Sequence, residues 1–167
     1  MNDQRFLAYA LKAVGDDNTV YLKKPMSSSE LGQSIRSAEA FLNRMEAYAL
    51  SGEEGLALAE LNAFRKTRVI GYTDVNLSGQ ALLDEIRLER CKDLCIEGHR
   101  WFDLRRQGMP EIKHTYKAEK GGAVYEYVLQ QGDPMYTLPF PNSVVLQNRA
   151  LVQNPSREMG ARQGEIQ

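Results

Sequence analysis

The chain has 167 residues, of which 26% are charged, and a formal net charge of −1 at pH 7. This length can bury a hydrophobic core without disulfides, and the near-neutral balance lacks the basic excess that is typical of nucleic-acid-binding proteins. No run of eighteen apolar residues that could cross a membrane is present. The first residues show neither a secretory signal nor a lipobox cysteine.

Residues 1–30 are expected to be irregular, apart from a short strand over Thr19–Leu22. The first helix is predicted over Glu30–Leu50, where apolar residues recur at helical spacing. A Ser-Gly pair ends it, and a second helix is predicted over Glu53–Lys66. Because the connection is short, we expect the two helices to form an antiparallel pair of the tetratricopeptide kind.

Ala81–Gly108 is predicted to be one long central helix, with Ser78 at its N-cap position. Gly98 within it suggests the close approach of a neighbouring helix. Its apolar arc also contains four charged residues, which must be paired or extend to water: Arg87, Arg90, Glu97 and Arg105. Two interpretations stay open, namely an ionic network threaded through the packing, or an ordinary amphipathic helix whose arginine stems lie along the core edge.

The remaining third of the chain is expected to form a small lobe of strands and loops. Tyr125–Leu129 alternates like an edge strand, and a second short strand is expected at Tyr136–Leu138. One helical turn is predicted at Ser143–Gln147, and residues 157–167 are expected to be a disordered tail. The predicted fold class is therefore mainly α, with a helix pair, a long central helix and a β/loop lobe.

Cys91, Cys95 and His99 follow one another at four-residue intervals on one predicted helical face, a spacing that suggests a zinc site. The first and third would be about 12 Å apart at 1.5 Å rise per residue, so the three cannot share one ion. We interpret the cysteines as small buried residues. No metal site and no cofactor are predicted.

Four carboxylates also recur every four residues: Glu85, Glu89, Asp93 and Glu97. Two of them could act as acid and base in glycoside cleavage. The solvated side of a helix produces the same series, and neighbouring basic residues neutralise it. No phosphate-binding loop, nucleophile elbow or metalloprotease motif is present, and no catalytic residue is predicted.

Four tyrosines on predicted loops or edge strands are candidates for stacking against sugar rings: Tyr72, Tyr116, Tyr125 and Tyr127. Ordinary packing at a sheet edge is the alternative interpretation. Trp101 falls inside the apolar arc of the central helix and is expected to lie in the core.

Three segments, in order, carry a resemblance to a known family. The first is the central-helix pattern Ile86, Glu89, Arg90, Leu94, Glu97, Gly98, His99, Arg100, Trp101, Phe102, Asp103, Leu104, Arg105 and Gly108. It is similar to the C-terminal signature of the SusD/RagB family, the outer-membrane nutrient-binding lipoproteins of Bacteroidetes-type bacteria. Ile35–Ala49 resembles that family's Arg-x-x-Glu-x-x-Leu-x-x-Ala-Glu-Ala helix, and Asp3–Arg5 resembles the Asp-x-Arg that precedes it. Leu138–Pro141 and Leu151–Pro155 resemble its Pro-hydrophobic-Pro and Gln-Asn-Pro segments.

The resemblance implies that residues 31–156 form a SusD-like C-terminal domain and that this chain is the C-terminal portion of a longer protein. The matching positions look structural: Arg36, Glu39, Glu46, Arg90, Glu97, Gly98, Arg100, Trp101, Asp103 and Arg105. We expect at least one charged pair to join the helix of Glu39 to the helix of Arg90 or Arg105.

The implied function is non-enzymatic, namely holding a nutrient, commonly an oligosaccharide, at the outer-membrane surface. The implied partner is a SusC-type TonB-dependent transporter, and the implied anchor is an N-terminal lipid outside this chain. Two alternatives stay open. A helical-repeat scaffold that binds a protein or peptide would show a groove between the first two helices, with an apolar floor and no aromatic platform. A glycan-active enzyme would show two carboxylates in a cleft at hydrolase separation.

Overall fold

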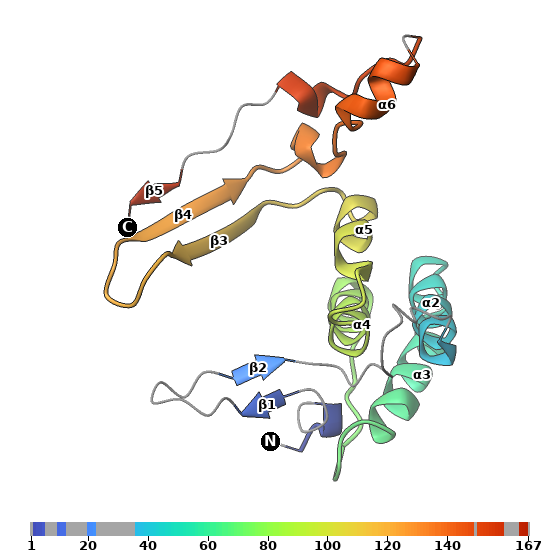
Figure 1. Ribbon diagram of the computed structural model, residues 1–167. Helices are drawn as coiled ribbons and strands as arrows, with labels where there is room; N and C mark the ends of the chain where they lie inside the picture. The colour runs from blue at the N-terminus through green and yellow to red at the C-terminus, as the bar shows by residue number, and fades with distance from the viewer. Residues whose placement is uncertain are drawn as a thin grey trace. The chain divides into compact units, whose positions relative to one another are not determined.

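The computed structural model describes residues 2–5, 10–12, 20–22, 36–148, 150–158 and 164–166. The chain forms two compact units, Met1–Arg100 and Trp101–Gln167. The described part is mainly helical with a small three-stranded sheet, so the predicted fold class is confirmed (Figure 1). No helix in this part is long and apolar enough to span a membrane.

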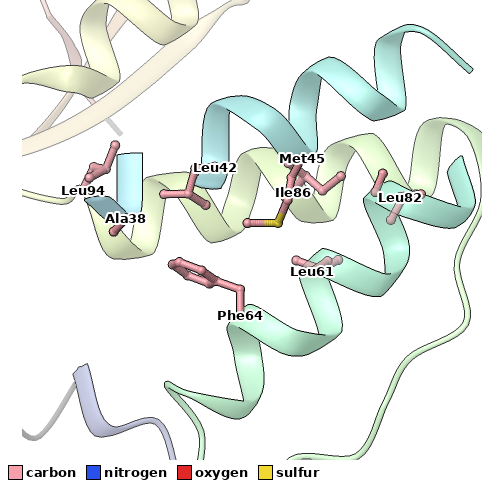
Figure 2. Close-up of a cluster of buried hydrophobic side chains, with 9 residues drawn as sticks. Ala38, Leu42, Met45, Leu61, Phe64, Leu82, Ile86 and Leu94 are labelled. Atoms are coloured by element: carbon pink, nitrogen blue, oxygen red, sulfur yellow. The ribbon is translucent and has the colours of Figure 1, made fainter. Parts of the chain in front are cut away.

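Three helices build the first unit: α2 (Ser37–Leu50), α3 (Glu54–Lys66) and α4 (Gly79–Asp93). The order of the labelled side chains in Figure 2 shows that α2 runs opposite to both α3 and α4. The predicted antiparallel pair is therefore present, and the second helix begins within one residue of its expected start. The first helix was predicted to begin at Glu30, but residues 30–35 lie outside the described part of the chain.

The core of this unit is a single cluster contributed by all three helices (Figure 2). Its members recur three or four residues apart on α2 and α3, as a buried stripe requires, while Leu82 and Ile86 lie one turn apart on α4 and Leu94 follows at the end of that helix. The cluster consists of Ala38, Leu42, Met45, Ala57, Leu61, Phe64, Leu82, Ile86 and Leu94. Each large apolar side chain buried there contributes about 1.5–3 kcal/mol relative to exposure to water, so this cluster is the main source of the unit's stability.

The expected single helix over Ala81–Gly108 is interrupted. The helix α4 ends at Asp93, a turn of five residues follows, and α5 (His99–Arg106) begins after it. Within the turn, Ile96 has a φ of +66° and Gly98 a φ of +80°, both in the left-handed region that an α-helix cannot contain. Gly98 is exposed, so its backbone conformation rather than a close helix approach accounts for the glycine.

The N-terminal segment is tied to the end of α3 by backbone hydrogen bonds. The N–H of Gln4 donates to the Arg68 carbonyl at 2.9 Å, and the N–H of Ile70 donates to the Asn2 carbonyl at 2.9 Å. Farther along, β1 (Ala10–Lys12) pairs antiparallel with β2 (Val20–Leu22). The short strand predicted near residues 19–22 is therefore confirmed.

The second unit contains a three-stranded antiparallel sheet in the order β3 (Ile112–Lys117), β4 (Val124–Leu129) and β5 (Glu165–Ile166) (Figure 1). The strand predicted at Tyr125–Leu129 is confirmed as β4, but its edge position is wrong at Tyr125 and Glu126, because β5 pairs with these two residues on the side away from β3. The strand β5 lies far from β4 in the sequence, within residues 157–167, which were expected to be a disordered tail.

Short helical segments follow the sheet. The short strand expected at Tyr136–Leu138 is absent, and a 3-10 turn η1 (Pro134–Tyr136) ends at its first residue. The Asp133 carboxylate accepts a hydrogen bond from the Met135 N–H at the start of this turn. The predicted helical turn is present as α6 (Asn142–Gln147), and a second 3-10 turn η2 spans Pro155–Glu158.

Candidate functional site

Two carboxylates of α4, Glu89 and Asp93, occupy the charged interior of the first unit. Each side chain is only 1% exposed. They lie four residues apart and therefore on the same face of the helix. A buried carboxylate without a partner is very costly, so each must lie against cations.

Glu89 lies between two arginines from different parts of the chain. The Nη1 atom of Arg5 is 2.6 Å from Oε1 of Glu89, and Nε of Arg65 donates to Oε2 at 2.8 Å. Arg65 also pairs with Glu85, one turn earlier on α4. These contacts join the N-terminal segment and α3 to the same face of α4.

Asp93 is held by two further arginines. Nε of Arg68 donates to Oδ1 at 2.8 Å, and Nη2 of Arg36 donates to Oδ2 at 3.1 Å. Arg36 also donates to the Asp93 carbonyl at 3.2 Å and pairs with Glu97 in the turn after α4. We call this set the α4 ion network, consisting of Arg5, Arg36, Arg65, Arg68, Glu85, Glu89, Asp93 and Glu97.

The electrostatics of the α4 ion network favour the charged forms. Burial by itself would lower the pKa of Arg5, but the hydrogen bond to Asp3 and the charge of Glu89 raise it above its ordinary value. Burial likewise opposes the charge of Arg65, while hydrogen bonds to Glu85 and Glu89 raise its pKa overall. The side-chain hydrogen bond from Arg5 lowers the pKa of Asp3. Arg5 and Arg65 are therefore held in their charged forms by their carboxylate partners.

A second row of contacts joins α2 to α4. Nε of Arg87 donates to Glu46 at 3.1 Å, and Arg90 donates from Nη1 to Asn43 at 2.7 Å. Nη2 of Arg90 lies 3.5 Å from Glu39, so the expected charged pair between these helices is present. Of the two interpretations of the central helix, the ionic network is the one that the structure shows.

The remaining motif residues lie at or beyond the boundary between the units. Arg100 and Arg105 are exposed, while Asp103 is buried and pairs with Arg106 at 3.0 Å. Trp101 is half-buried and stacks on Tyr136, with ring centroids 5.0 Å apart. Phe102, the next residue on α5, is 66% exposed.

Arg65 and Arg68 belong to the site and were not singled out from the sequence. Arg65 follows the buried Phe64 in the last turn of α3, and Arg68 lies just after the helix. The guanidinium of Arg68 is 4.4 Å from the centroid of the Phe64 ring. An arginine on the apolar side of a helix was the available signal. Their carboxylate partners are 20 to 25 residues away in sequence, so the pairing itself had no local signature.

The three residues considered for zinc do not share one helical face, because α4 ends before Cys95. We expected both cysteines to be buried, but each is only half-buried, and both are free. In the part of the chain that the structure describes, no group of three or more His, Cys, Asp or Glu side chains could hold a metal ion.

The four candidate tyrosines fall in two different places. Tyr72 lies in the loop after α3 and donates its hydroxyl to Oδ1 of Asn62 at 2.8 Å. Tyr116 is on β3 and is 56% exposed, while Tyr125 and Tyr127 are half-buried on β4. The sheet therefore brings three of the four together.

Comparison with known proteins places the chain in a family. The SusD family model matches residues 10–156. No curated protein matches the chain. Among solved structures, a SusD superfamily protein from Bacteroides fragilis is 28% identical, with a TM-score of 0.66 over 89% of this chain and 33% of that one.

Two further structures show the same fold. A SusD-like carbohydrate-binding protein from Bacteroides vulgatus ATCC 8482 is 21% identical, with a TM-score of 0.57 over 90% of this chain and 38% of that one. A SusD-like protein from Bacteroides fragilis NCTC 9343 is 24% identical, with a TM-score of 0.55 over 72% and 25% of the two chains. The chain thus spans 25% to 38% of the length of these proteins. Its sequence match over residues 10–156 shows that the chain belongs to the SusD family.

Proposed function

We propose that this chain is part of a non-enzymatic, SusD-type protein that holds an oligosaccharide at the bacterial outer-membrane surface. Its family membership supports this function, and one protein of similar fold is a carbohydrate-binding member. The proposed partner is a SusC-type TonB-dependent transporter, to which the bound nutrient would be delivered.

The state of the α4 carboxylates carries the non-enzymatic part of the proposal. Glu89 and Asp93 are two of the four carboxylates from which a glycoside hydrolase interpretation would draw its acidic pair, yet both are 1% exposed and bound by arginines. A catalytic acid must reach the glycosidic oxygen of its substrate, and a carboxylate that is 1% exposed and enclosed by guanidinium groups cannot do so. This arrangement supports a structural role for both groups.

The test is to incubate the 167-residue chain with a panel of neutral hexasaccharides built from glucose, xylose, mannose or galactose. We expect heat of binding in titration calorimetry and unchanged hexasaccharide by chromatography. Release of shorter sugars that persists in Glu89→Gln and Asp93→Asn variants would point to an enzyme with a different site. Release that both variants abolish, while their helical circular dichroism signal stays equal to that of the wild-type chain, would overturn the structural role of these carboxylates.

A second candidate function, docking of a peptide helix, is favoured by a groove in the first unit. The groove holds about 410 Å³ and is lined by residues of α2, α3 and the turn after α3. Its floor contains Phe41 and Phe64, but arginines lie over both rings, at 5.1 Å and 4.4 Å from the centroids. These ring faces are therefore not free for sugar stacking.

Selection of peptides from a displayed library on the wild-type chain tests this second candidate. Peptides with apolar residues at helical spacing should be enriched, and they should lose binding to a Phe41→Ser variant. Phe41 is 48% exposed, so this substitution should leave the core intact. Enrichment that is equal on both proteins would exclude the groove.

A further inference from the structure

The sheet of the second unit has two chemically different faces. Directly opposed residues of an antiparallel pair project to the same face, and side chains alternate along each strand. The register opposes His114 to Tyr127, and Tyr125 to both Tyr116 and Ile166. These five side chains therefore share one face, which we call the tyrosine face (Figure 1 shows the three strands).

The opposite face carries the charges of the three strands. It consists of Lys113, Thr115, Lys117, Val124, Glu126, Val128 and Glu165. Within β3, β4 and β5, no Lys, Arg, Asp or Glu lies on the tyrosine face. The alternation thus separates a charged, solvated surface from an uncharged surface of aromatic and aliphatic side chains.

A glycine next to β5 shapes the tyrosine face. A Cβ atom at Gly164 would lie 2.8 Å from two ring carbons of Tyr127 and 2.9 Å from Cβ of Tyr125. The Tyr127 ring therefore packs directly over the Gly164 backbone, in space that any other residue would fill. This packing explains the partial burial of Tyr127 and keeps its ring against the backbone of Gly164.

The tyrosine face is nevertheless open to solvent. Tyr116 is 56% exposed and Ile166 is 71% exposed, while Tyr125 and Tyr127 are half-buried. The spacing of Tyr125 and Tyr127, two residues along one strand, is about 7 Å, and that across to Tyr116 is about 5 Å. The surface is therefore an array of rings at intervals comparable with the size of one sugar ring.

We propose that the tyrosine face binds a neutral oligosaccharide, with sugar rings stacked on Tyr116, Tyr125 and Tyr127. This inference rests on the proposed nutrient-binding function and gives it a place in the chain. Tyrosine offers an apolar ring face with a polar hydroxyl at its tip, which matches the apolar faces and hydroxyl edges of a pyranose. The lack of charge on this face disfavours an anionic glycan. Tyr72, whose hydroxyl is bound to Asn62, is not part of the site.

The experiment uses the full 167-residue chain, the same neutral hexasaccharides and titration calorimetry. Replacing the exposed ring with Tyr116→Ala should weaken binding about tenfold, the effect of losing one central contact residue. Tyr116→Phe keeps the ring and should retain most of the affinity. Gly164→Ala should also weaken binding, because it displaces the Tyr127 ring without removing any aromatic group.

The matched control is Thr115→Ala, which changes the neighbouring exposed residue of β3 on the opposite face. Its affinity should equal that of the wild-type chain. If the wild-type chain binds a hexasaccharide and Tyr116→Ala binds it equally well, this inference fails while the proposed function stands. If the wild-type chain binds none of them, both fail. Concentration-dependent dimerisation that Tyr116→Ala abolishes, without sugar binding, would show that the face is a protein contact instead.

Discussion

The side-chain amide of Gln153 binds both backbone groups of Phe140. The Phe140 N–H donates to Oε1 at 2.8 Å, and Nε2 of Gln153 donates back to the Phe140 carbonyl at 3.0 Å. Phe140 stands between Pro139 and Pro141, which have no N–H, so its amide is the one backbone donor of that tripeptide. The glutamine thus replaces the strand that two prolines prevent from pairing there.

Gln153→Leu should therefore release the Phe140 amide. We expect its hydrogen exchange to accelerate and the second unit to lose about 1 kcal/mol, because both hydrogen bonds to Phe140 near the surface are lost, together with the one that Gln153 accepts from the Asn154 N–H. Gln147→Leu, an exposed position at the end of α6, is the control and should leave the Phe140 amide protected. Equal protection of Phe140 in wild type and Gln153→Leu would show that the amide contact contributes nothing.

Glu89→Gln should destabilise the first unit strongly. The substitution keeps the shape of the side chain but leaves Arg5 and Arg65 largely buried with their shared carboxylate gone. Breaking a buried ion pair on one side costs about 3–5 kcal/mol. The measurement is the free energy of unfolding of the chain in urea, followed by the helical signal.

Glu60→Gln provides the matched comparison. Glu60 pairs with Arg44 at 2.8 Å, but this arginine side chain is 50% exposed. A solvent-exposed pair contributes about 0–1 kcal/mol, so this variant should unfold close to the wild-type midpoint. Similar losses for Glu89→Gln and Glu60→Gln would mean that burial adds nothing to the network.

Local patterns in the sequence were sufficient to predict α2, α3, α6 and the family, because each depends on residues close together in the chain. The break after α4 could not be predicted in this way. It requires Ile96, a β-branched residue, to adopt a φ of +66°, and only surrounding tertiary structure stabilises such a conformation. The buried Leu94 just before the turn is part of that structure.

The candidate site was predictable in its composition but not in its pairing. A charged pair between Glu39 and Arg90 or Arg105 was expected because all three are positions matched in the family resemblance, and Glu39 pairs with Arg90. The four arginines of the α4 ion network come from separate segments, and nothing local indicates which carboxylate each one binds. The tyrosine face likewise depends on β5, which joins the sheet from a distant part of the chain.

Trp101 is the only tryptophan of the chain, so its fluorescence reports on the second unit alone. Its ring is stacked on Tyr136, which is 1% exposed and donates its hydroxyl to the Pro110 carbonyl at 2.5 Å. Tyr136→Leu should shift the emission to longer wavelength, because removal of the ring admits water to the indole. Tyr136→Phe keeps the stack and should keep the emission, while losing about 1 kcal/mol of stability. Identical spectra for wild type and Tyr136→Leu would contradict the stacked arrangement.

The Asp3–Arg5 contact predicts a specific dependence of stability on acid. The hydrogen bond from Arg5 lowers the pKa of Asp3 in the folded chain below its ordinary value of 3.8. The unfolded chain therefore takes up this proton first as the pH falls, and the contribution of Asp3 to stability is present above about pH 5 and lost below it. Asp3→Asn removes this term, so the variant should lose less stability than the wild type between pH 6 and pH 3 in urea unfolding.

The window above pH 6 supplies the control for this experiment. Asp3 is ionised there in both the folded and the unfolded chain, so the stability difference between wild type and Asp3→Asn should not change from pH 6 to pH 8. Arg5 remains charged throughout, because its pKa is raised further above its ordinary value. An equal acid-induced loss in both proteins would mean that the Asp3–Arg5 contact also persists in the unfolded chain or does not form in the folded one.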